Sequence, residues 1–114
     1  MGIEISGEHG GADASFTSAI VVIEELAKID PSVSALCNIH NTLVGNILRK
    51  YGTKGQQEKW LPQLAMEKLG SFCLSESASG SDAFALQTKA VKDGNHWTIN
   101  GSKTYAQSLL RVLH

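Results

Sequence analysis

Residues 70–82, GSFCLSESASGSD, mark the point where the hydrophobic pattern of this chain changes. Before them, apolar residues recur every three or four positions, as they do on one face of a helix. Phe72–Leu74 is a short apolar run between a glycine and a stretch of small residues, which predicts a buried strand that enters a loop. The polar loop (residues 75–82) carries four serines. The stretch therefore separates a helical part from a strand-forming part, and predicts an α+β fold.

Two helices are predicted upstream, after a glycine-containing loop over residues 1–12. Asp13 is placed to cap the first helix, whose apolar spacing continues to Lys28. Asp30 at the N-cap and a proline at the next position open the second helix, which continues for five turns. Its last turn is basic, and Gly52 is expected to end it as a left-handed C′ residue.

A third helix is predicted from the capping box formed by Thr53 and Gln56. Pro62 is expected to interrupt this helix and to begin a further turn over residues 63–68, which Gly70 closes. Downstream, residues 87–92 and 96–99 alternate like strands around Asp-Gly-Asn at 93–95, which is a hairpin signal. Residues 100–101, Asn-Gly, are a second turn signal.

Composition limits the possible partners. The chain has 114 residues, is 42% hydrophobic and 18% charged, and has a formal net charge of −1. Without clusters of Lys or Arg, neither nucleic acid nor an anionic membrane is expected as a partner. The longest apolar run, Ala19–Ile23, is too short to span a membrane. The N-terminus shows neither a secretory signal nor a transit peptide.

Cysteine and histidine are spaced unlike metal ligands. Cys37 and Cys73 are isolated, which predicts two buried thiols and a reducing compartment. Four histidines lack any metal-binding spacing, so no metal site is assigned. His40 lies on an apolar helical stripe and is expected in the core or lining a pocket. The polar loop offers hydroxyl and backbone donors to a polar ring or phosphate, although its composition also fits an ordinary loop.

The stretch over residues 73–82 resembles the flavin-binding signature of the acyl-CoA dehydrogenases: Cys, a hydrophobic residue, Ser or Thr, and Glu, followed by Ala or Ser and Gly-Ser-Asp. Similarity to that family, and especially to its short/branched-chain branch, extends over residues 2–103. The supporting motifs occur in the family's order: Gly2-Ile3-Glu4, Gly10-Gly11, residues 23–27, Asn41-Thr42-Leu43, Tyr51-Gly52-Thr53, Gln57, Trp60-Leu61-Pro62 and residues 100–103.

The resemblance implies a domain organisation. Residues 1–69 would be the end of an N-terminal all-α domain, and residues 70–108 would be the first strands of an antiparallel, β-barrel-like middle domain. Residues 109–114 no longer follow the family and form a divergent tail. The chain would then be a truncated form of the enzyme.

The resemblance also implies a FAD site. Its cofactor-binding residues would be Phe72, Cys73, Leu74, Ser75, Glu76, Ser77, Ala78, Ser79, Gly80 and Ser81, followed by Tyr105, Ala106 and Gln107. Ser75 would offer its hydroxyl and N–H to the pyrimidine end of the flavin. Ser81 would also contact the substrate. The family has Trp-[Ile/Val]-[Ser/Thr] where this chain has residues 105–107, so the hydroxyl that reaches flavin N5 is replaced by Gln107.

The activity implied by the family is oxidation of an acyl-CoA to the trans-2-enoyl-CoA, with electrons passed on to electron-transfer flavoprotein by a homotetramer in the mitochondrial matrix. No catalytic residue is assigned, because no carboxylate of this chain matches the family's glutamate base. The chain alone is therefore expected to be inactive. By analogy, Cys37, His40 and Asn41 would line the acyl pocket. The alternative is a non-enzymatic helical fragment that pairs with full-length subunits.

Overall fold

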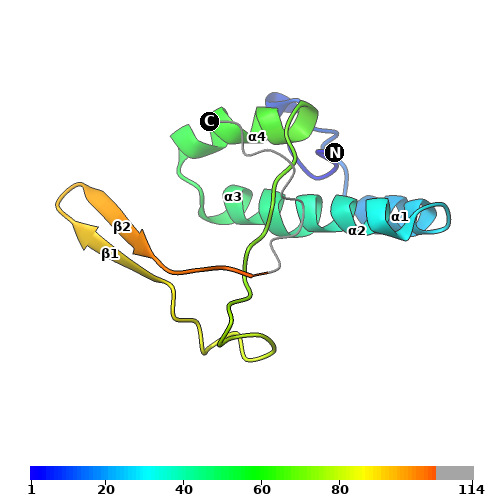
Figure 1. Ribbon diagram of the computed structural model, residues 1–114. Coiled ribbons are helices and arrows are strands. Elements are labelled where there is room, and N and C mark those ends of the chain that lie inside the picture. The colour runs from blue at the N-terminus through cyan, green and yellow to red at the C-terminus, as the bar shows by residue number, and fades with distance from the viewer. Residues whose placement is uncertain (105–114) are drawn as a thin grey trace.

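The first long helix begins where a serine can cap it. The computed structural model describes residues 1–104, and α1 spans Phe16–Ala27 within them (Figure 1). The Ser15 hydroxyl accepts the N–H of Ser18 at 3.2 Å. The predicted cap at Asp13 is wrong, because Asp13 has a φ of 50° and donates its N–H to the Ile5 carbonyl, so it belongs to the preceding loop. That loop contains a single 3-10 turn, η1 (Gly7–His9).

The second predicted helix is one continuous rod with an unpredicted π-helical centre. It consists of α2 (Pro31–Asn38), the π-helix η2 (Ile39–Gly45) and α3 (Asn46–Tyr51). The predicted cap is confirmed, since Asp30 Oδ1 accepts the N–H groups of Ser32 and Val33.

Side chains explain the wider turn. Asn41, Thr42 and Asn46 each donate to the carbonyl four residues earlier, at 2.8–2.9 Å. In an α-helix those carbonyls accept backbone N–H groups, so the side chains compete with the regular pattern. The five-turn spacing of apolar residues could not reveal this competition.

The end of the rod and the next helix differ from prediction in two details. Gly52 has a φ of −68° and is extended, so the predicted left-handed C′ glycine is wrong. Its lack of a side chain matters for space, because a Cβ there would lie 2.5 Å from the Leu48 carbonyl oxygen. α4 spans Lys54–Met66 and continues through Pro62 without the predicted interruption. Pro62 has no N–H to donate to the Glu58 carbonyl. Glu58 is exposed, so water can hydrogen-bond to that carbonyl instead, while the opposite face of α4 is buried.

The N-terminal capping box of α4 is confirmed. Thr53 Oγ1 accepts the N–H of Gln56, and Gln56 Oε1 accepts the N–H of Thr53 at 2.8 Å. Thr53→Ala is expected to lower the free energy of unfolding by about 1 kcal/mol, because one helix donor loses its partner. Urea denaturation followed by circular dichroism measures this. Thr17→Ala, at an exposed position of α1, is the matched control; equal losses in both variants would contradict the assignment.

The core lies between α4, the N-terminal loop and the η2–α3 part of the rod. Its buried members are Ile5, Leu61, Leu64 and Ala65, with Val44 and Leu48 packed against them. Figure 1 shows α4 running back above α3 and next to the N-terminal loop. No helix of the described region is long and apolar enough to cross a membrane.

The predicted strand over Phe72–Leu74 is wrong. These residues are irregular, and Cys73 and Leu74 are exposed. Within residues 1–104 they have no ladder partner, so the local apolar run alone does not form a strand. The prediction of two buried thiols therefore holds for Cys37 but not for Cys73.

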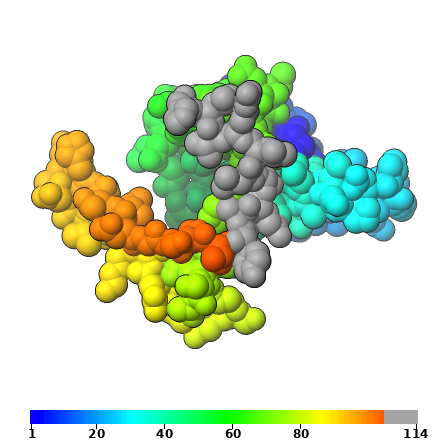
Figure 2. Space-filling model, in the orientation of Figure 1, coloured from blue at the N-terminus to red at the C-terminus, as the bar shows by residue number. Residues whose placement is uncertain are grey.

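The predicted hairpin is confirmed. β1 (Lys89–Asp93) pairs antiparallel with β2 (His96–Asn100), and Gly94 has the positive φ, 56°, that the two-residue turn requires. The second predicted turn at residues 100–101 is wrong, because Asn100 still pairs with Lys89 and the chain continues without a turn. Figures 1 and 2 show the hairpin projecting away from the helices, on the side opposite α1. A helical region followed by a two-stranded antiparallel sheet agrees with the predicted α+β class.

Candidate functional site

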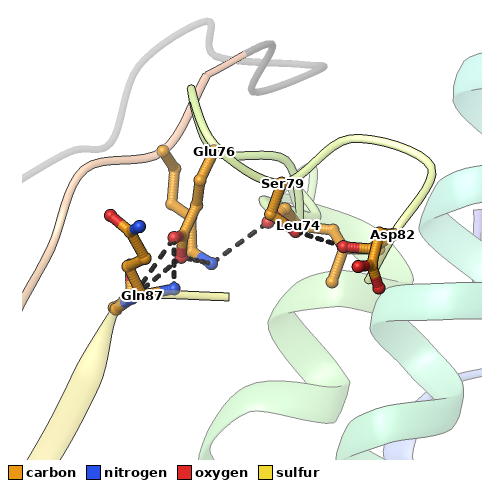
Figure 3. A network of polar contacts seen from close by, with 7 residues as sticks. Leu74, Glu76, Ser79, Asp82 and Gln87 are labelled. Atoms are coloured by element: carbon orange, nitrogen blue, oxygen red, sulfur yellow. Dashed lines mark hydrogen bonds and ion pairs between the residues drawn. The ribbon is translucent and has the colours of Figure 1, made fainter. Parts of the chain in front are cut away.

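The polar loop is closed by its own backbone. Glu76 and Ser79 exchange two N–H to carbonyl hydrogen bonds, at 2.9 and 3.1 Å. The Ser79 hydroxyl donates to the Asp82 carbonyl at 2.6 Å (Figure 3). Asp82 Oδ1 accepts the N–H of Phe84. Ser79 is buried and the loop is tightly folded. Small residues at 77–81 permit this turn, which the sequence indicated only as a loop.

The Glu76 carboxylate turns inward and binds protein groups. The residue is 7% exposed, and its carboxylate accepts the N–H groups of Gln87 at 2.7 Å and Thr88 at 3.1 Å. Lys103 Nζ lies 2.7 Å from Glu76 Oε1. The Lys103 ammonium above all, then the Thr88 side chain, and then the N–H groups of Gln87 and Thr88 lower the pKa of Glu76 to about 2. This carboxylate is ionised and fully engaged, so it is a poor general base.

The backbone carbonyl of Ser75 is hydrogen-bonded within the described residues, while its hydroxyl and its N–H are not. Its carbonyl accepts the N–H of Thr104 at 2.8 Å, and Lys103 Nζ donates to the preceding carbonyl of Leu74 at 3.1 Å. Ser75 is half-buried, and no other described residue hydrogen-bonds its hydroxyl or its N–H. These two groups are therefore available to a ligand at a backbone position that is fixed from both sides.

The other sequence-predicted cofactor residues divide into inward and outward positions. Phe72 is half-buried, and Glu76 and Ser79 are buried. The exposed ones are Cys73, Leu74, Ser77, Ala78, Gly80 and Ser81. The predicted contacts at Tyr105, Ala106 and Gln107 lie outside the described residues, as does the divergent tail.

Sequence reasoning missed the groups that support the loop. Gln87 and Thr88 contribute backbone N–H groups, which leave no trace in a sequence. Lys103 did carry a signal, since its motif was part of the family resemblance and the loop holds a carboxylate for it to pair with. No set of three or more His, Cys, Asp or Glu residues within residues 1–104 is arranged to hold a metal ion.

Cys37, His40 and Asn41, the three residues expected to line an acyl pocket, are buried in the protein interior. His40 is 1% exposed; its Nδ1 accepts the N–H of Gly70 at 3.0 Å, so its Nε2 carries the proton and donates to the Leu64 carbonyl at 2.9 Å. Burial lowers the pKa of His40. Asn41 accepts the N–H of Ile3 at 2.9 Å and donates to the carbonyl of Cys37. The prediction that His40 is a core or pocket residue agrees with its burial.

Comparison with known proteins places this chain. Residues 1–68 match the family model "Acyl-CoA dehydrogenase, N-terminal domain". Over 105 residues the chain is 55% identical to the mitochondrial short/branched chain specific acyl-CoA dehydrogenase of Rattus norvegicus, and over 108 residues it is 52% identical to that of Bos taurus. These matches cover 92% and 95% of this chain but 24% and 25% of the relatives, so it spans about a quarter of their length.

A solved structure agrees with the sequence matches. Butyryl-CoA dehydrogenase from Megasphaera elsdenii superposes with a TM-score of 0.84 at 35% identity, over 92% of this chain and 29% of that one. The family model covers more than half of the chain, and the sequence and structural matches extend across the hairpin region as well. This chain belongs to the acyl-CoA dehydrogenase family.

Proposed function

We propose that this chain supplies the pyrimidine-side part of the FAD site of a short/branched-chain acyl-CoA dehydrogenase. The observation that supports the proposal is Ser75, whose hydroxyl and N–H are open while its backbone is fixed by residues 103–104. The residues present fit a flat polar ring edge, because fixed donors on a loop of small residues can approach it closely. FAD, when bound, supplies the hydride acceptor for oxidation of an acyl-CoA to the trans-2-enoyl-CoA.

The chain's own residues would bind and orient. Ser75 would direct its hydroxyl and N–H at the ring edge, where negative charge develops on reduction, and preorganised donors stabilise such charge. Ser81 is exposed at the far end of the polar loop and would contact the substrate. No described carboxylate takes the base role, since Glu76 is ionised and paired with Lys103.

The whole protein's partners are proposed from its relatives. Short/branched-chain relatives that carry "mitochondrial" in their names support a mitochondrial matrix location. An acyl-CoA substrate, electron-transfer flavoprotein as the electron acceptor and a homotetramer are proposed for the whole enzyme.

Flavin titration tests the proposal. The purified chain is mixed with FAD, and flavin fluorescence and absorbance are followed. We expect saturable binding that Ser75→Ala weakens by about three- to tenfold, the equivalent of one lost hydrogen bond. Ser32→Ala, at an exposed position of α2 outside the residues implied to bind FAD, should bind as the unmodified chain does. With an acyl-CoA and an artificial electron acceptor, the chain alone should show no turnover.

Two outcomes would contradict the proposal. If flavin fluorescence and absorbance do not change when the chain is added at high FAD concentration, the alternative of a non-enzymatic helical fragment is favoured. Turnover at the rate of an ordinary flavoenzyme would show that the chain does contain a competent base.

A further inference from the structure

Lys103 joins both sides of Ser75 to the segment that follows β2. Its Nζ donates to the Leu74 carbonyl at 3.1 Å and to Glu76 Oε1 at 2.7 Å. The next residue, Thr104, donates its N–H to the Ser75 carbonyl at 2.8 Å. Three consecutive loop residues are therefore held by two consecutive residues that lie nearly thirty positions later. The position of Ser75 depends on this attachment.

Glu76 extends the attachment to the start of the hairpin. Its two carboxylate oxygens accept the N–H groups of Gln87 and Thr88, which immediately precede β1 (Figure 3). The Glu76 side chain is 5% exposed and that of Lys103 is 27% exposed. Among the described residues, Lys103 is the charged group that contacts this carboxylate. A buried carboxylate that lost its cation would destabilise the folded loop as an unpaired charge or would take up a proton.

We propose that Glu76 and Lys103 are positioning residues that hold the Ser75 hydroxyl and N–H at the place where the flavin binds. The inference rests on the proposed function, because Ser75 is the residue expected to contact the flavin. The Glu76 carboxylate and the Lys103 ammonium are both engaged with protein groups, so they are expected to act on the flavin through Ser75. Lys103 fixes the backbone around Ser75. Glu76 links the same backbone to the residues just before β1, so the position of Ser75 depends on the position of the hairpin. Preorganised donors bind more tightly because less freedom is lost on binding.

Amide hydrogen exchange tests the attachment without any ligand. In Lys103→Met and Glu76→Gln, the amides of Gln87, Thr88 and Thr104 should exchange about tenfold faster or more. Lys103→Arg should keep most of the protection, because it keeps the charge. Lys89→Met removes the same charge from an exposed strand position and should leave these amides unchanged. Unchanged exchange in Lys103→Met would overturn the proposal.

Titration of the Glu76 carboxyl separates an ion-pair role from general packing. Its carbon-13 signal should titrate near pH 2 in the unmodified chain. In Lys103→Met the pKa should rise toward the ordinary glutamate range, since the largest cause of its lowering is gone. In Lys89→Met it should stay low. Circular dichroism should show that all variants retain the helices, which have a core of their own.

Flavin affinity then links the attachment to the site. Lys103→Met and Glu76→Gln should weaken FAD binding by about tenfold, with Lys103→Arg between them and the unmodified chain. Equal affinity in all variants would overturn the positioning role. If the unmodified chain binds no FAD, the proposed function and its positioning role both fail, while the exchange and titration results still decide whether Glu76 and Lys103 fix the loop.

Discussion

Replacing Leu61 with alanine is expected to lower the free energy of unfolding by about 2–5 kcal/mol, the usual cost of removing a fully buried leucine side chain. Leu61 is 2% exposed and lies on the core face of α4, against Ile5 and the rod. The cluster is small, so few neighbours can move in to fill the space left. Since small domains have total stabilities of about 5–15 kcal/mol, this loss is a large share of the whole. Urea denaturation followed by helical circular dichroism measures it.

Ile29→Ala is the matched control for this prediction. Ile29 lies between α1 and α2 and is 86% exposed, although its side chain is as large as that of Leu61. Its replacement should change the free energy of unfolding by less than about 0.5 kcal/mol. If both variants lost the same stability, the loss would come from the unfolded chain or from local backbone effects, and the proposed core would be wrong.

Where local chemistry was decisive, the sequence predicted the fold well. The Asp30 cap, the capping box at Thr53 and the turn at Gly94 each depend on neighbouring residues, and each is confirmed. The two failures at Pro62 and at Phe72–Leu74 have another cause, which is the effect of contacts distant in the sequence. Pro62 remains helical because the burial of the opposite face of α4 outweighs one lost hydrogen bond. Phe72–Leu74 does not form a strand because no described strand pairs with it.

The candidate site could be located from the sequence, but its support could not. The serines and glycine of the polar loop are visible in one short stretch. The inward turn of Glu76 depends on backbone N–H groups eleven and twelve residues later and on an ammonium at Lys103. Likewise, the burial of His40 was predicted, but its two backbone partners, in different segments, were not. Backbone partners carry no residue-specific signal, so only a structure identifies them.

His40→Leu is expected to lower the free energy of unfolding at neutral pH by about 1–3 kcal/mol for each buried backbone group left without a partner. The ring joins the rod to the C-terminal part of α4 through Leu64 and, through Gly70, to the segment that precedes the polar loop. Gly70 packs closely against the rod, because a Cβ there would lie 2.4 Å from Val44 Cγ1. Leucine fills the space but offers neither a donor nor an acceptor.

The same ring makes the stability of the chain depend on pH. Burial lowers the pKa of His40 below its ordinary value of 6.5, so the folded protein holds the neutral ring. Its contribution is therefore complete above about pH 6.5 and decreases as the pH falls toward the lowered pKa, because the unfolded chain takes up the proton first. Protonation also removes the Nδ1 lone pair that accepts the N–H of Gly70.

The unmodified chain should lose stability on acidification from about pH 7.5 to about pH 5, and His40→Leu should lose less, so that the two stabilities converge. His96→Gln, at an exposed position of β2, should follow the unmodified chain throughout. Parallel stability curves for the unmodified chain and His40→Leu would mean that His40 does not carry the acid sensitivity.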